Sequence, residues 1–159
     1  MDFDEVVKKR KSVRSFKNKK ASWKDVLEAI DAAIQGPFAG NYNHLKFLIV
    51  ENKAKIREIA SLCDQLWLNQ VGVLVLVCSD DAHLEDIYDD RGRVYSRQEA
   101  GAAIQTLLLK LTDLGLASCW VGSYSDSEIR KELEIPTHIQ IEAIIPIGYE
   151  DRIEKKKIK

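Results

Sequence analysis

The sequence predicts an α+β fold in which a central mixed or antiparallel sheet is covered by helices. Helical and strand-like stretches alternate along most of the 159 residues. The stretch 71–78 is apolar almost throughout and rich in β-branched residues, as expected for a central strand buried on both faces. No glycine-rich turn follows the first strand at 47–50, which disfavours a dinucleotide-binding Rossmann fold.

Length and composition indicate an ordinary soluble protein with one domain over residues 1–159. Apolar residues make up 45% and charged residues 31% of the chain. The formal net charge of −1 gives no global attraction to nucleic acid or to anionic membranes. No segment is apolar for long enough to span a bilayer, and residues 1–11 are too charged for a signal peptide.

Three cysteines, Cys63, Cys78 and Cys119, lie far apart in the sequence. An odd number at this spacing is neither a disulfide framework nor a zinc pattern. We therefore expect buried, reduced thiols and a cytoplasmic location.

The first two helices have recognisable starts. Asp2 and Glu5 are placed as in a capping box and open a helix over 3–10. Ser22 is a good N-cap for a second, amphipathic helix, which ends at Gly36 and the proline after it.

The middle of the chain is predicted from its apolar periodicity. The run 47–50 predicts a strand, and one apolar face over 53–68 predicts a helix. After the central strand, the acidic stretch 80–93 indicates a surface loop or a short helix.

The last part begins with the longest predicted helix, 95–114, whose small residues 100–103 leave a smooth surface for another helix or a flat ligand. A short strand over 118–121 follows. Ser125 is then the expected cap of a helix that ends near residue 133, and 139–147 predicts the final strand.

The stretch 10–16 is the first candidate binding segment, with three cations and two hydroxyls between apolar residues. An extended backbone places Arg10, Ser12 and Arg14 on one side. Arginine and serine there could bind a phosphoester through charge-assisted hydrogen bonds. On local grounds alone, a solvated basic stretch is the simpler interpretation.

Two further stretches could approach a planar ligand. The loop 36–44 combines small residues with the amides of Asn41 and Asn43, and it is otherwise a plain loop. Gly122 and Ser123 follow a short strand and could present backbone N–H groups, although such a sequence is more often a simple turn.

These stretches, in this order, resemble the nitroreductase family of FMN-dependent oxidoreductases. The resemblance covers nearly the whole chain and is carried by five segments: 10–16, 32–43, 98–109, 114–120 and 144–149. It implies a nitroreductase-like fold and a domain-swapped type of homodimer with two FMN sites at the interface.

The resemblance also implies roles for individual residues in FMN binding. Arg10, Lys11, Ser12 and Arg14 would hold the phosphate, the ribityl chain and part of the isoalloxazine edge. A basic residue near the end of the chain, Lys156 or one of its neighbours Lys155 and Lys157, would complete the phosphate site; the sequence does not choose among these three.

The remaining contacts would come from two other segments. Those lining the flavin from the other subunit would be Pro37, Phe38, Ala39 and Asn41. The backbone N–H groups near flavin N5 would be those of Gly122 and Ser123.

The activity that the resemblance implies is a ping-pong reaction. NAD(P)H would reduce the flavin, and a nitroaromatic, a quinone or a free flavin would then reoxidise it. Specialised chemistry, such as reductive dehalogenation or flavin fragmentation, is an alternative. Phe38 and Ala39 replace small hydroxyl residues of the family pattern, which keeps open a third possibility, a non-catalytic flavin-binding protein.

No acid–base pair stands out, as expected if the cofactor carries the chemistry. His83 and His138 lie in polar surroundings and suit surface or structural roles. His44 follows the candidate flavin loop, so it either has a structural role or lines a substrate pocket. We predict no catalytic side chain and no metal.

Overall fold

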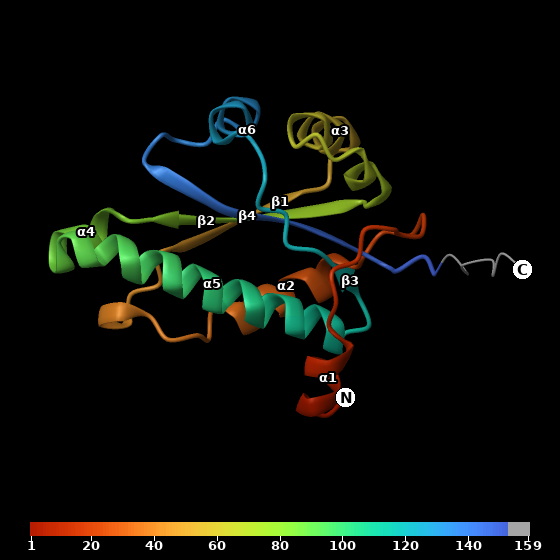
Figure 1. The fold of residues 1–159 in the computed structure, drawn as a ribbon, viewed down its shortest axis with the longest axis horizontal. Coiled ribbons are helices and arrows are strands. Elements are labelled where there is room, and N and C mark those ends of the chain that lie inside the picture. The colour runs from red at the N-terminus through yellow and green to blue at the C-terminus, as the bar shows by residue number, and fades with distance from the viewer. Residues whose placement is uncertain (153–159) are drawn as a thin grey trace, which may run out of the picture.

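A four-stranded sheet divides the protein into two helical layers (Figure 1). The computed structural model describes residues 1–152. The strand order is β1-β2-β4-β3, and every neighbouring pair is antiparallel, which confirms the predicted fold class. The strands are β1 (Leu45–Val50), β2 (Val73–Asp80), β3 (Ala117–Ser118) and β4 (Ile139–Gly148).

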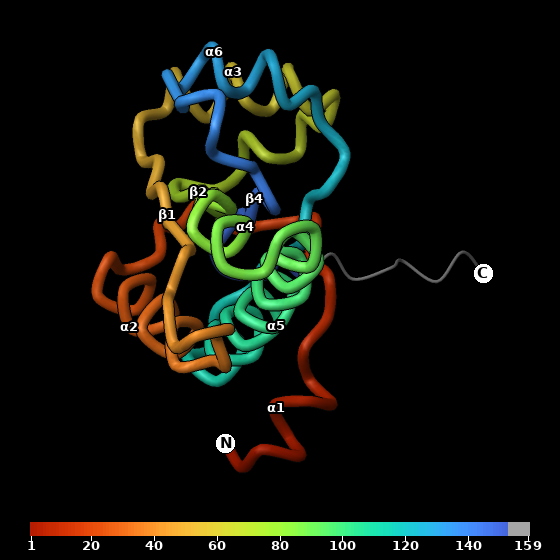
Figure 2. The backbone as a smooth tube through the Cα atoms, turned by 90° about the vertical axis from the view of Figure 1, so that its left-hand side faces the viewer, coloured from red at the N-terminus to blue at the C-terminus, as the bar shows by residue number. Residues whose placement is uncertain are grey.

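Helices cover both faces of this sheet. Both views place α3 and α6 together on one face and α2 and α5 on the other (Figures 1 and 2). Within residues 1–152, no helix combines the length and apolar character needed to cross a membrane. The helices are α1 (Phe3–Lys9), α2 (Trp23–Ala33), α3 (Lys53–Leu62), α4 (Ala82–Tyr88), α5 (Asp90–Asp113) and α6 (Asp126–Leu133), with short 3-10 helices η1 (Ala39–Asn41) and η2 (Leu66–Gln70).

Strand β2 is the centre of the core. Leu74 and Leu76 pack in the layer that contains Ile59 of α3 and Ile129 of α6, while Val75 packs in the α2 and α5 layer. All five side chains have no exposed surface. Burying each contributes about 1.5–3 kcal/mol. Because both faces are covered, the strand is apolar from Val73 to Cys78, as the sequence predicts, and only its last two residues are polar.

The predicted helix starts are confirmed for the first two helices. Asp2 Oδ1 accepts the Glu5 N–H at 2.9 Å, and Ser22 Oγ accepts a first-turn N–H at 3.3 Å. Ser125 is the N-cap residue of α6, as predicted, but its side chain accepts no first-turn N–H, and its hydroxyl lies 3.3 Å from that of Ser127.

The helix predicted over 53–68 ends early. Helix α3 stops at Leu62, and Asp64 has a left-handed φ of 51° that breaks the helical path. The chain resumes as η2, where Leu68 is fully buried. The apolar periodicity continues across the break, so the pattern alone indicates a single helix.

The acidic stretch 80–93 is more regular than predicted. It forms α4 and the first turn of α5, which begins at Asp90, before the predicted residue 95. A Cβ added at Gly92 would lie 2.4 Å from the backbone of Leu84. The close crossing of the two helices therefore requires glycine at this position.

Candidate functional site

The segment 10–16 is fixed along the edge of the sheet. It leaves α1 and runs beside β3, where the Val13 N–H donates to the Ser118 carbonyl at 2.9 Å. Val13 and Phe16 are buried, and the Phe16 N–H donates to Gln70 Oε1 at 2.7 Å. These contacts hold the backbone while the side chains between the buried positions face outward.

The cations of this segment are not equivalent. Lys11 Nζ lies 2.7 Å from Glu150 Oε1, and this contact lowers the pKa of the Glu150 carboxyl. Arg14 and Ser12 are exposed and Arg10 is half-buried. Within residues 1–152, neither guanidinium pairs with a protein group. Arg10 and Arg14 are therefore available to bind an anion, whereas Lys11 is already engaged.

A cavity of about 840 Å³ lies beside the same segment. Lys11 and Val13 line it together with Ser118, but Arg10 and Arg14 are not among its lining residues. The cavity and the arginine side of the segment are thus different surfaces.

Gly122 and Ser123 follow a short segment that is hydrogen-bonded to β4. Val121 pairs with Ile144 in both directions, N–H to carbonyl, at 3.0 Å each. The next two residues are exposed, and a Cβ at Gly122 would have no neighbour within 4 Å. Over the described part of the chain, neither of their N–H groups has a protein acceptor. Ser118 lies in the same segment, which brings these amides to the sheet edge that holds residues 10–16.

The loop 37–44 has an unusual backbone. Gly40 and Asn41 both adopt left-handed φ values, of 61° and 54°. Pro37 and Asn41 are exposed, whereas Phe38 and Ala39 are half-buried. A glycine tolerates this conformation freely, but asparagine does so at a cost that neighbouring contacts must offset.

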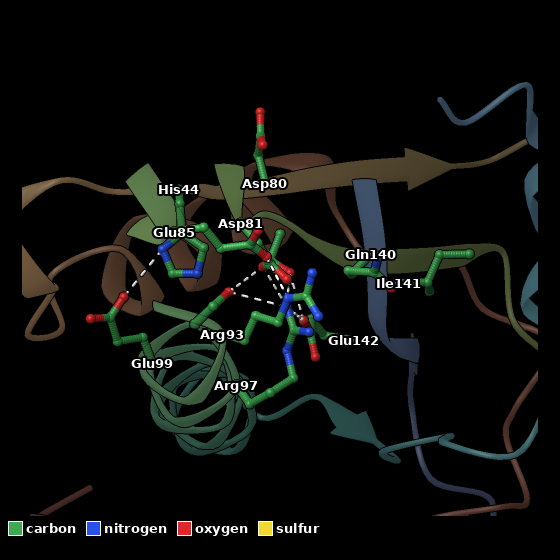
Figure 3. A network of polar contacts seen from close by, with 12 residues as sticks. His44, Asp80, Asp81, Glu85, Arg93, Arg97, Glu99, Gln140, Ile141 and Glu142 are labelled. Atoms are coloured by element: carbon green, nitrogen blue, oxygen red, sulfur yellow. Dashed lines mark hydrogen bonds and ion pairs between the residues drawn. The ribbon is translucent and has the colours of Figure 1, made fainter. Parts of the chain in front are cut away.

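A carboxylate on α5 holds this loop at two points. Glu99 Oε1 accepts the Ala39 N–H at 2.5 Å. Glu99 Oε2 lies 3.2 Å from Nδ1 of His44, whose side chain is 0% exposed (Figure 3). The two atoms are close but not aligned as a hydrogen bond, and His44 Nε2 is also buried without a partner. His44 therefore has a structural position in this chain and does not line an open pocket.

The loop and the arginine segment lie near opposite ends of α5. The loop contacts Glu99, whereas Thr112 of the same helix lines the cavity beside Lys11. At about 1.5 Å per residue, Glu99 and Thr112 are about 20 Å apart along the helix axis. Figure 1 shows the orange loop and the red N-terminal segment near different ends of α5. One chain therefore holds residues 10–14 beside β3 at one end of α5 and residues 37–41 near the other end.

A second polar cluster, not predicted from the sequence, joins the start of α5 to the sheet (Figure 3). Arg97 Nη2 lies 2.5 Å from Asp81 Oδ1 and 2.6 Å from Glu142 Oε1. Ser96 Oγ donates to Asp81 Oδ1 at 2.6 Å, and Ser79 Oγ to Glu142 Oε1 at 2.5 Å. The arginine is paired with two carboxylates, so we assign the cluster a structural role.

The other two histidines lie on the surface, as predicted. His83 is exposed and its ring lies 4.0 Å from that of Tyr42. His138 is exposed beside a cavity of about 470 Å³ near Arg97. Within the described residues, no cluster of three or more potential metal ligands occurs.

The donors at the sheet edge suit a flavin phosphate and ring. Two arginines without a partner in residues 1–152 are of the type preferred by a phosphate, and the exposed residues Gly122 and Ser123 offer two backbone N–H groups farther along the same edge. Lys155, Lys156 and Lys157, the expected basic residues of the tail, lie outside the described residues. The residues that are described fit FMN.

Comparison with known proteins identifies related chains. The family model described as "Nitroreductase family" matches residues 7–81 and 61–149. A protein of Thermotoga neapolitana named "Iodotyrosine deiodinase" is 27% identical, with 92% of this chain and 88% of that protein covered. A "Putative NADH dehydrogenase/NAD(P)H nitroreductase" of Methanothermobacter thermautotrophicus is 29% identical, with 94% and 78% covered.

Solved structures share the fold. A nitroreductase family protein from Clostridium novyi has a TM-score of 0.87 at 25% identity, over 96% of this chain and 87% of that one. An FMN-dependent nitroreductase from Clostridium difficile has a TM-score of 0.80 at 24% identity, over 94% and 88%. The second likeness, below 25% identity, concerns the fold alone.

Proposed function

Because this chain belongs to the nitroreductase family, we propose that two copies of it bind FMN at their interface and reduce a small-molecule acceptor with NAD(P)H. The observation that carries the proposal is the sheet edge described above. There, Arg10 and Arg14 have no protein partner within the described residues, and the exposed residues Gly122 and Ser123 follow β3 along the same edge of the sheet.

The arginines would bind the phosphate of FMN, with Ser12 as a short neutral donor. Charge-assisted hydrogen bonds of this kind contribute about 1.5–3 kcal/mol each. The Gly122 and Ser123 N–H groups would hold the reactive edge of the flavin, and their fixed direction costs no reorganisation during the reaction. We propose Lys156 or a neighbouring lysine as the third phosphate ligand.

The dimer is proposed from the geometry of α5. The loop that contains Pro37, Phe38, Ala39 and Asn41 contacts Glu99, about 20 Å along this helix from Thr112, where residues 11 and 13 lie. We infer that one chain does not bring both regions to the same FMN. A second copy with its own loop at the first copy's arginine segment would complete the site. Each site would then take its phosphate ligands from one subunit and its flavin-lining loop from the other.

Bound FMN would supply the hydride and electron transfer that side chains cannot perform. The chain's own contribution is to hold the cofactor and to leave one ring face for the nicotinamide and the acceptor in turn. The name of the Methanothermobacter relative supports a nicotinamide as reductant. We propose a nitroaromatic, a quinone or a free flavin as acceptor.

A second candidate function is reductive dehalogenation. It is favoured by the Thermotoga relative, named for a deiodinase, whose match covers 92% of this chain. The fold, cofactor and dimer would be the same, and only the acceptor would differ. A turnover assay with a halogenated phenol beside a nitroaromatic and a quinone separates the two functions.

Reduction of the bound flavin under anaerobic conditions tests the proposal. Purified protein loaded with FMN should lose its absorbance near 450 nm when NADH or NADPH is added, and an acceptor should restore it. Bound flavin that neither nicotinamide reduces would favour a non-catalytic binding role. Protein that takes up no FMN would refute the proposed function altogether.

The cellular compartment we propose is the cytoplasm. Cys63, Cys78 and Cys119 are all free and buried. Burial raises the pKa of Cys63 to about 11 and, with the nearby Glu142 carboxylate as a smaller cause, the pKa of Cys78 to about 11. Thiols of this kind persist where the environment keeps them reduced.

A further inference from the structure

We propose that Glu99 is a positioning residue that, together with His44, sets the conformation of the flavin-lining loop. This inference rests on the proposed function for its effect on FMN. The contacts that support it are present in the chain itself. They concern one carboxylate of α5 and both ends of the loop 37–44.

The first support is the position of the two contacts. Glu99 Oε1 accepts the N–H of Ala39 at the start of the loop, and its Oε2 faces His44 at the end. His44 is in turn anchored to the sheet, because its carbonyl accepts the Asp80 N–H at 3.0 Å. A single side chain therefore joins the helix, the loop and the sheet.

The second support is the backbone between these contacts. Gly40 and Asn41 follow each other with left-handed φ values, a conformation that a free loop would leave readily. The hydrogen bond from Ala39 to a carboxylate is the kind of contact that offsets such a cost. Loss of Glu99 should free the loop rather than unfold the protein.

The third support is the burial of His44. Its side chain is 0% exposed, and its ring meets that of Phe38 edge-on, with centroids 6.1 Å apart. Phe38 is one of the residues expected to line the flavin. His44 thus packs directly against a side chain proposed to line the flavin, and Glu99 Oε2 lies 3.2 Å from its Nδ1.

The test compares three variants of α5. Glu99→Ala removes both contacts. Glu99→Gln keeps an oxygen that can accept from Ala39 but removes the charge. Ser96→Ala is the matched control, because it breaks a buried hydrogen bond to Asp81 one turn away without touching the loop.

Hydrogen exchange on the FMN-free protein gives the first readout. Glu99→Ala should accelerate exchange of the Ala39 amide at least about tenfold, with Glu99→Gln intermediate and Ser96→Ala unchanged. Wild-type exchange at Ala39 in Glu99→Ala would overturn the inference. If that variant does not fold, Glu99→Met decides, because its side chain fills a similar space but cannot accept the Ala39 N–H. Wild-type exchange at Ala39 in Glu99→Met would equally overturn the inference.

FMN binding gives the second readout. Glu99→Ala should raise the FMN dissociation constant about tenfold and change the visible circular dichroism of the bound flavin. Ser96→Ala should lower the melting temperature yet keep both properties. An equal loss of FMN affinity in Ser96→Ala would mean that Glu99 acts only through general stability. Failure of the wild-type protein to bind FMN would refute the proposed function, while the exchange result would still decide the role of Glu99.

Discussion

The arginine segment 10–16 and the loop 37–44 are built in opposite ways. The segment has a fixed backbone and side chains that project without protein partners, as Arg10 and Arg14 do within the described residues. The loop has a strained backbone, and buried side-chain contacts hold it in place. The first offers charged side chains to an anion, and the second offers a surface whose shape is set by contacts within the chain.

The difference indicates how the two regions contribute to a binding site. Unpaired guanidinium groups cost little in water, so the arginine segment can remain open until an anion binds. A flavin-lining wall must exclude water from a ring face, so its shape has to be set beforehand. Because these regions lie near opposite ends of α5, we propose that each binding site combines the segment of one subunit with the loop of another.

The largest effect is expected from the double variant Arg10→Ala, Arg14→Ala. It removes two charge-assisted phosphate contacts, so the FMN dissociation constant should rise at least about 100-fold. The FMN-free protein should melt at the wild-type temperature, because neither side chain has a protein partner in the described part of the chain. Isothermal titration and thermal melting measure the two quantities. Wild-type FMN affinity in the double variant would overturn the phosphate assignment.

A smaller effect is expected at the loop from Gly40→Ala. The residue has a φ of 61°, and a Cβ would lie 3.3 Å from the hydroxyl of Tyr88. The backbone strain should lower the free energy of unfolding by about 1–2 kcal/mol, as measured by urea denaturation. In a Tyr88→Phe background the hydroxyl contact is absent, so the decrease in the free energy of unfolding caused by Gly40→Ala comes from backbone strain alone. No loss in either background would contradict the strained conformation.

The smallest effect is expected from Lys11→Met. Lys11 already pairs with Glu150, so FMN affinity should fall by less than about threefold, far less than in the arginine variants. The pair should contribute no more than about 1 kcal/mol to stability.

The contribution of this pair should depend on pH. The pKa of Glu150 is lowered from 4.5 in the folded protein, chiefly by Lys11. The stabilisation is therefore complete above about pH 4.5 and is lost as the pH falls through the lower, folded-state pKa. Denaturation of wild type and Lys11→Met at several pH values measures the difference. A difference that grows on acidification would contradict the assignment.

Local chemistry made much of the fold predictable. Side-chain caps at Asp2 and Ser22 mark two helix starts, and the apolar run of β2 marks the buried strand. The break at Asp64 was not predictable, because it needs a left-handed residue where the sequence has no glycine. The regular structure of residues 80–93 depends on the close crossing of α4 and α5 at Gly92. The sequence of neither helix alone indicates this contact.

The candidate site was predictable to a similar extent. The sequence indicated the arginine segment as a candidate, because its cations and hydroxyls are neighbours in the chain. The pairing of Glu99 with Ala39 and His44 joins residues more than 50 positions apart, and no local pattern links them. Similarly, only the folded chain reveals that Lys11 is paired with Glu150 while the arginines are not.

Native mass spectrometry of the FMN-loaded protein tests whether each FMN site is shared between two subunits. A site built from the arginine segment of one subunit and the loop of another requires a dimer that carries two FMN molecules. We expect this species to be the dominant one, and we expect both copies to remain folded when FMN is removed. A monomer that carries one tightly bound FMN would contradict it.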